Sequence, residues 1–182
     1  MRVLVLVLRL LVMGVLLAGC STPVEMSDWE RENMQRQAPP DDNVVPPPFP
    51  ERAKLIEFPP ADASGFRFFV DGSTLGVDPK AGVVRYVLVA QSPSGTQNIT
   101  FEGLRCPSAE YRVYATGQAA NNWIPARTAW QPVRNARPWQ AALYREYFCP
   151  QKVAIRDAAE GVRALQAGGH PSFKGASPPY GR

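Results

Sequence analysis

The chain has 182 residues, with 20 lysines and arginines against 16 aspartates and glutamates, which gives a net charge of +4. The chain contains one histidine and three cysteines, and no two of the cysteines are closely spaced as in the usual zinc-binding motifs. Residues 61–182 are long enough for one folded domain of about 120 residues with a single core.

The amino-terminal residues have the organisation of an export signal. Arg2 and Arg9 give a basic start, and an apolar run follows from Leu10 to Leu17. This run is too short to cross a bilayer, for which about 20 residues are needed, but it suits the apolar part of a signal peptide. Residues 1–19 are therefore predicted to be a signal peptide.

The end of this signal resembles the bacterial lipobox, because Leu17-Ala18-Gly19-Cys20 has the order apolar, small, small, cysteine. The resemblance implies that Cys20 becomes the first mature residue and is acylated, and several acyl chains anchor a protein stably in a membrane. Ser21 stands where, by resemblance to Gram-negative lipoproteins, an aspartate would favour the inner membrane. The implied location is the outer membrane, at its periplasmic face. An ordinary signal peptide with an incidental cysteine is the alternative.

Two further cysteines, Cys106 and Cys149, remain once Cys20 is assigned to the lipid. In an exported chain an even pair of cysteines predicts a disulfide. The bridge would close a loop of about 44 residues, for which loop entropy suggests roughly 4 kcal/mol of stabilisation. A metal pair or a reactive thiol is the alternative, but the only histidine is His170 and no second cysteine is close in sequence.

A proline-rich segment follows the proposed anchor, and residues 21–60 carry eight acidic against four basic side chains. Proline-rich chains prefer the extended polyproline II conformation and are poor material for a core. Residues 20–50 are therefore predicted to be the lipidated cysteine and a semi-rigid tether. A short helix after Ser27 and Asp28 is compatible with this segment. Its PPFP motif could alternatively be a ligand for an aromatic-lined groove.

The charge of the chain changes sign along its length. Residues 61–182 hold fourteen basic and eight acidic side chains, a balance of +6, whereas residues 20–60 sum to −4. A basic domain on an acidic tether suits anionic lipid headgroups or cell-wall polymer, and arginines on an ordinary surface are the alternative. Nucleic acid is not expected as a partner after export, and neither a metal nor another cofactor is expected.

The predicted domain, residues 51–170, begins with strands. Turn residues separate five segments rich in β-branched and aromatic side chains, which are residues 66–70, 73–77, 82–91, 96–106 and 110–117. Connections as short as Asp71-Gly72 hold no crossover helix, so neighbouring strands are predicted to be antiparallel. The segment 82–91 is apolar on both faces, which predicts a central strand that is covered on both sides.

Two helices are predicted after the strands. Pro138 suits the first helical position, and the helix should end near Cys149, so that the disulfide would pin its end to the sheet. Its residues Trp139, Leu143 and Tyr147 share one apolar stripe.

The second predicted helix begins at Asp157 with a capping box to Glu160 and continues to Gly168-Gly169. Residues 171–182 are predicted to be a flexible tail. The predicted fold class is α+β, an antiparallel meander of about five to six strands followed by two C-terminal helices packed on the sheet.

The strings VDGSTLGVDPKAGVVRYVLVAQSPSGTQNITFEGLRC, YRVYATG and CPQKVAIRDAAEGVRALQAGGHP resemble the CNP-like family of proteobacterial envelope proteins. The resemblance extends over roughly residues 50–171 and agrees with the signal and cysteine patterns. It implies an envelope lipoprotein, but it carries over no activity and no catalytic residue.

One segment, NNWIPARTAWQPVRNARPWQ, interleaves tryptophans with arginines. These residues are Trp123, Arg127, Trp130, Arg134, Arg137 and Trp139. Tryptophan and arginine dominate binding hot spots, and this segment joins the strands to the helices, where loops often carry recognition. The alternative is that the tryptophans are core residues that pack helices on the sheet.

Two classes of function follow. The first is a non-catalytic binding or assembly module for an envelope protein or glycan, acting through the segment above. The second is an envelope hydrolase that uses carboxylates, for which the candidates are Asp71, Asp78, Glu102 and Glu110. Asp71 and Asp78 are also ordinary turn residues. His170 follows a double glycine and precedes a proline, which suggests a mobile position without a partner rather than a catalytic base.

Overall fold

The structure is a computed structural model that describes residues 44–60, 65–118 and 121–174. The signal peptide, Cys20 and the predicted tether up to Asn43 lie outside the described residues, as do residues 175–182 of the predicted tail. The described residues belong to one unit that begins at Val44. The last part of the predicted tether therefore belongs to the folded unit, which starts earlier than the expected residue 51.

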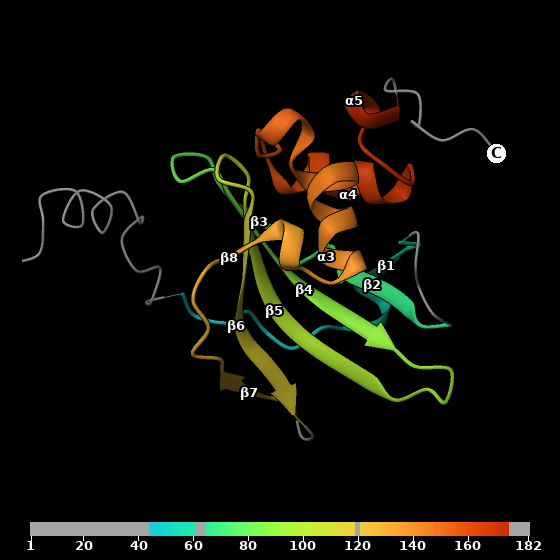
Figure 1. The fold of residues 1–182 in the computed structure, drawn as a ribbon. Coiled ribbons are helices and arrows are strands. Elements are labelled where there is room, and N and C mark those ends of the chain that lie inside the picture. The colour runs from blue at the N-terminus through green and yellow to red at the C-terminus, as the bar shows by residue number, and fades with distance from the viewer. Residues whose placement is uncertain (1–43, 61–64, 119–120, 175–182) are drawn as a thin grey trace, which may run out of the picture. The chain divides into compact units, whose positions relative to one another are not determined.

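An antiparallel sheet of eight strands lies at the centre of this unit (Figure 1). The strands are β1 (Leu55–Phe58), β2 (Arg67–Asp71), β3 (Gly76–Asp78), β4 (Val83–Gln91), β5 (Gln97–Arg105), β6 (Glu110–Gln118), β7 (Asn122–Pro125) and β8 (Gln131–Pro132). Their order is β1-β2-β4-β5-β6-β7, with β3 paired to β4 and β8 paired to β6. The predicted antiparallel meander is confirmed, with a larger number of strands.

Strands β2 and β3 do not form the hairpin that Asp71-Gly72 predicted. Both pair with β4 along the edge opposite β5, through Val70 opposite Leu88 and Gly76 opposite Arg85. The Asp71 carboxylate accepts hydrogen bonds from the backbone N–H and the hydroxyl of Ser73, at 2.9 and 2.6 Å. The side chain thus closes a local turn that interrupts one long strand, since an Asx-type turn does not require the chain to reverse.

Helices cover one side of the sheet (Figure 1). They are η3 (Val133–Asn135), α3 (Pro138–Ala142), the π-helical η4 (Leu143–Phe148), η5 (Pro150–Lys152), α4 (Ala158–Gln166) and α5 (Pro171–Lys174). A further short helix, η2 (Arg52–Lys54), directly precedes β1. Both predicted helix starts are confirmed, because Pro138 opens α3 and the Asp157 side chain accepts from Glu160 N–H at 2.7 Å. Within the described ranges, no helix has the length and apolar character needed to span a membrane.

The main core lies between these helices and the sheet, on a side that we call the helix face. Its largest fully buried side chains include Tyr86, Leu104, Leu143, Tyr147 and Phe148. The predicted disulfide is present here between Cys106, directly after β5, and Cys149, directly after η4, with their Cα atoms 5.2 Å apart. It ties the end of the α3–η4 helix to the sheet, as expected.

The opposite side of the sheet has a smaller core of Val87, Phe101, Tyr114 and Ala115. Residues 44–50, which we call the strap, lie against this side. The Trp123 indole N–H donates to the Pro47 carbonyl at 2.8 Å, and the Phe49 and Trp123 ring centroids are 4.9 Å apart. We call this side the strap face, and its core confirms that β4 is covered on both sides.

Candidate functional site

The three tryptophans of the predicted binding segment divide between the two faces. Trp139 lies on the helix face, where its ring stacks on Phe68 with centroids 4.9 Å apart. Trp123 and Trp130 pack against the strap-face core. The tryptophans therefore belong to two separate clusters, and packing is the observed role of Trp139.

The three arginines of that segment, Arg127, Arg134 and Arg137, are exposed. Arg137 is the N-cap residue of α3, and its backbone N–H donates to the Gln140 side-chain oxygen at 3.0 Å. Within the described residues, the cation–π contacts involve other arginines. The expected Trp/Arg cluster is thus not formed by the predicted arginines.

The strap face instead brings together three arginines from neighbouring strands. Arg85 of β4 lies opposite Gly103 of β5, and Gly103 lies opposite Arg112 of β6. Because Gly103 has no side chain, the ring of Tyr114 fills the space between the two arginines, and a Cβ on Gly103 would lie 2.8 Å from Tyr114 Cε2. The guanidinium carbons are 5.9 Å (Arg85) and 5.3 Å (Arg112) from the centroid of this ring.

The third arginine, Arg105, stacks over Trp130 with its guanidinium carbon 4.1 Å from the ring centroid. Its Nη1 donates to Glu110 at 3.0 Å, and Glu110 also accepts from the Ser108 hydroxyl at 2.6 Å. Only 13% of the Arg105 side chain is exposed. The Trp130 ring, the Glu110 carboxylate and the burial of the side chain together hold the Arg105 guanidinium in one orientation.

We call Arg85, Arg105, Arg112, Tyr114 and Trp130 the arginine cluster. Two N–H donors of this cluster, Arg105 Nε and the Trp130 indole N–H, are buried and have no hydrogen-bond partner among the described residues. Buried donors are usually paired in folded proteins, and exceptions call for an explanation. Sequence analysis missed this cluster, although Arg85 and Arg112 stand at alternating positions of predicted strands.

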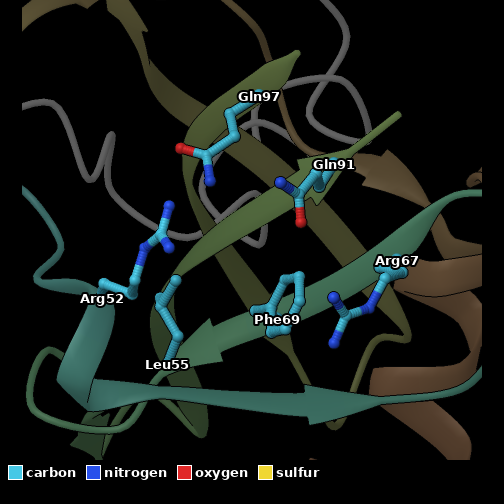
Figure 2. Close-up of a pocket in the computed structure, with 6 residues that line it drawn as sticks. All are labelled: Arg52, Leu55, Arg67, Phe69, Gln91 and Gln97. Carbon is cyan, nitrogen blue, oxygen red and sulfur yellow. The ribbon is translucent and has the colours of Figure 1, made fainter. Parts of the chain in front are cut away.

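A polar pocket lies at the other end of the strap face (Figure 2). It has a volume of about 290 Å³ and is lined by Arg52, Leu55, Arg67, Phe69, Gln91 and Gln97. Arg67 donates from Nε and Nη2 to the two carboxylate oxygens of Glu57, at 2.9 and 2.6 Å. These hydrogen bonds lower the pKa of Glu57 and raise the pKa of Arg67.

The structure does not bring together the four carboxylates considered for hydrolysis. Asp71 caps its own turn, and Asp78 accepts from the backbone N–H groups of Lys80 and Ala81, both at 3.1 Å. Glu110 is bound to Arg105 on the strap face, whereas Glu102 lies in the core of the helix face. Each of these carboxylates has a local structural partner.

Glu102 is the most buried of the four, with 2% of its surface exposed. It accepts hydrogen bonds from the hydroxyls of Tyr86 and Thr100, at 3.1 and 2.7 Å, and from the Gln140 amide at 3.1 Å. Burial raises the pKa of Glu102, and the three hydrogen bonds act in the opposite direction. The network fastens α3 to strands β4 and β5.

His170 is not at the mobile, partnerless position that the sequence suggested. It is 8% exposed, its backbone N–H donates to Glu146 O at 2.6 Å, and its Nδ1 accepts from Ser172 N–H at 3.2 Å. Because Nδ1 is an acceptor, Nε2 carries the proton of the neutral ring; Nε2 lies 3.4 Å from a carboxylate oxygen of Glu160. His170 thus fastens the end of α4 to η4.

The fold and the surface together define an α+β domain with helices on one face of an antiparallel sheet and an arginine–aromatic surface on the other. The model of the CNP1-like family matches residues 35–166. The chain therefore belongs to the CNP1-like family, and the match begins within the segment predicted as a tether. No curated protein and no solved structure matches the chain.

Proposed function

We propose that the protein is a lipoprotein of the bacterial cell envelope, anchored through Cys20 to the periplasmic face of the outer membrane. We further propose that its domain is a non-catalytic binding or assembly module for an anionic envelope partner, either protein or glycan. The order of residues 17–20 supports the anchor. The Cys106–Cys149 disulfide supports export, because such bonds persist in oxidising compartments.

The observation that carries the binding function is the stacking of Arg105 on Trp130 within the arginine cluster. An arginine that is already oriented loses little conformational entropy when it binds a carboxylate or phosphate. Arginine and tryptophan are also the residues most enriched in binding hot spots. Arg85 and Arg112 lie on the same surface, on either side of the Tyr114 ring.

The hydrolase alternative receives less support from the same geometry. Carboxylate catalysis needs two groups that face one substrate bond, at separations of roughly 5–10 Å in glycosidases. Glu102 lies on the helix face and Glu110 on the strap face, while Asp71 and Asp78 are occupied in turns. The binding module is therefore the preferred proposal.

Photo-crosslinking in intact cells tests the binding function. A crosslinking amino acid replaces Ser108, an exposed residue beside Glu110, and a control places it at the exposed Gln166 of α4. We expect a crosslinked envelope partner from position 108 and none from position 166. Arg105→Gln should reduce the product at least about tenfold, since a hydrogen bond to a charged group contributes roughly 1.5–3 kcal/mol.

Arg134→Gln is the matched control, because it removes the same charge from an exposed position in η3. It should leave the crosslinked product unchanged. If Arg134→Gln reduces the product more than Arg105→Gln does, the partner binds the segment around η3 and not the arginine cluster. The thermal midpoint of each variant is measured alongside, so that unfolding is separated from lost binding.

Intact-mass analysis of the protein recovered from cells tests the anchor. We expect a chain that begins at Cys20 and carries acyl groups, and a Cys20→Ser chain that loses this mass and leaves the outer-membrane fraction. An unprocessed amino terminus without acyl groups would contradict the lipoprotein proposal.

A further inference from the structure

The pocket on the strap face is built from a row of polar side chains across three strands. Arg67 of β2 lies opposite Gln91 of β4, and Gln91 lies opposite Gln97 of β5. The two glutamines therefore flank the turn of one hairpin, and their carboxamides are neighbours (Figure 2). A carboxamide has both donors and an acceptor, so this row suits a ligand that carries hydroxyl groups.

Apolar side chains lie between the polar ones. Figure 2 shows Phe69 between Arg52 on one side and Arg67 on the other, with Leu55 next to Phe69. Both Leu55 and Phe69 are partly exposed. An apolar surface surrounded by a few oriented polar groups is the usual composition of a small-molecule site.

The charge of the pocket selects the kind of anion. Arg67 is already neutralised by Glu57, through two hydrogen bonds of 2.9 and 2.6 Å. Arg52 is exposed and has no acidic partner within the described ranges. Arg52, Arg67 and Glu57 sum to +1, which matches a single carboxylate better than a doubly charged phosphate.

The volume limits the size of the ligand. The pocket of about 290 Å³ lies just below the usual range for ligand sites, roughly 300–1,000 Å³. It therefore has room for about one sugar ring. A ring with hydroxyl groups, a single carboxylate and an apolar C–H face has the chemistry of an acidic sugar.

We propose that this pocket binds one acidic sugar unit, with the carboxylate on Arg52, the hydroxyl groups on Gln91 and Gln97, and the C–H face against Phe69 and Leu55. This inference rests on the proposed binding function and names a ligand class for the strap face. The pocket and the arginine cluster lie at opposite ends of β4 and β5, so the two sites are separable by mutation.

Titration calorimetry of the full-length chain in detergent tests the proposal, with glucuronate, glucose and acetate as probes. Glucuronate and glucose differ by one carboxylate, and acetate offers the carboxylate without a ring. We expect glucuronate to bind at least about tenfold more tightly than either of the others, since one charge-assisted contact contributes that much. If glucose binds as tightly as glucuronate, the carboxylate is not recognised. If acetate binds as tightly as glucuronate, the ring is not recognised. Each result overturns the proposal.

Two variants locate the binding site. Arg52→Gln should weaken glucuronate binding at least about tenfold, and Gln97→Ala should weaken it several-fold, whereas Arg134→Gln should not change it. Both lining residues are exposed, so these variants are expected to fold. If glucuronate binds equally to wild type and Arg52→Gln, the assignment of this pocket is wrong.

The outcome is separable from that of the proposed function. If glucuronate does not bind while Arg105→Gln still abolishes the crosslink at position 108, only the acidic-sugar inference fails. If glucuronate binds through Arg52 and no partner is crosslinked, the acidic-sugar site stands and the partner interaction at the arginine cluster fails.

Discussion

The two faces of the sheet differ in how their polar side chains are arranged. On the helix face, Glu102 has three donors, and the Tyr144 hydroxyl donates to Cys106 O at 2.9 Å. The Trp139 indole N–H is the buried side-chain donor of this face that has no hydrogen-bond partner among the described residues. On the strap face, Arg105 Nε and the Trp130 indole N–H are buried with no hydrogen-bond partner among the described residues. The Glu102 network stabilises one fold, whereas a guanidinium held in place by stacking, such as that of Arg105 on Trp130, suits an anionic ligand.

This contrast predicts where mutations act. Substitutions on the helix face should change the free energy of unfolding, and substitutions on the strap face should change binding with little effect on stability. The following predictions run from the largest expected change in stability to the smallest. Each has an outcome that would contradict this difference between the two faces.

The largest effect is expected from the disulfide on the helix face. Cys106→Ala with Cys149→Ala removes a bridge that spans 43 positions, and loop entropy predicts a loss of roughly 4 kcal/mol. Urea unfolding with and without a reductant measures it, and reduced wild type should approach the double variant. A loss under about 1 kcal/mol would show that helix packing alone holds η4 on the sheet.

The next largest effect is expected from Glu102→Leu. This change leaves the Tyr86 hydroxyl and the Gln140 amide without their acceptor in the core, which should cost about 2–4 kcal/mol. Glu102→Gln keeps one oxygen acceptor and removes the buried charge, so its stability should lie close to that of wild type. Equal losses in both variants would mean that the charge, and not the hydrogen bonds, stabilises the network.

The pH dependence of Glu102 gives a second measurement. Its pKa is raised by burial above the reference value of 4.5. The fold therefore favours the protonated carboxyl. The stability that the protonated carboxyl contributes to the fold is fully present below about pH 4.5 and is lost as pH rises through the folded pKa. Glu102→Gln should gain stability relative to wild type over that rise, and a relative loss would contradict this sign.

A smaller loss is expected from Gly161→Ala in α4. In an exposed helix this change adds up to about 1 kcal/mol of stability. In this chain the new Cβ would overlap Leu75 Cδ2 and lie 2.7 Å from Ile155 Cδ1, and both side chains are buried. Overpacking costs about 1–3 kcal/mol, so we expect a net loss of about 1 kcal/mol.

The exposed Gln166 in the same helix provides the control for Gly161→Ala, since Gln166→Ala should change stability by less than about 0.5 kcal/mol. Thermal unfolding of the two variants compares them directly. A stabilised Gly161→Ala variant would mean that Leu75 and Ile155 repack without cost, so that the helix face is looser than the structure indicates.

Features with local sequence signals were predicted correctly. Pro138 and the Asp157 cap mark helix starts through residues within one turn, and the two-sided apolar character of β4 is visible in its own nine residues. The cysteine pair was predictable because only two sulfur atoms remained to be paired. These features require no knowledge of how distant segments meet.

Features that depend on long-range register were not predictable. The strap contacts Trp123 across a separation of 76 positions, and nothing in the proline-rich sequence distinguishes residues 44–50 from the segment before them. Arg85 and Arg112 become neighbours only because Gly103 lies between them in the register of three strands. His170 looked mobile because its partner Glu160 lies across the double glycine.

Apart from the control Gln166→Ala, the smallest effect on stability is expected from Glu110→Gln on the strap face. The amide keeps an oxygen acceptor for the Ser108 hydroxyl, but it removes the negative charge 3.0 Å from Arg105 Nη1. Partly exposed ion pairs contribute little, so the loss should be under about 1 kcal/mol. The arginine cluster loses the negative charge beside Arg105, so the crosslinked product at position 108 should increase with an anionic partner. A stability loss as large as that of Glu102→Leu would place Glu110 among the structural groups and remove the contrast between the two faces.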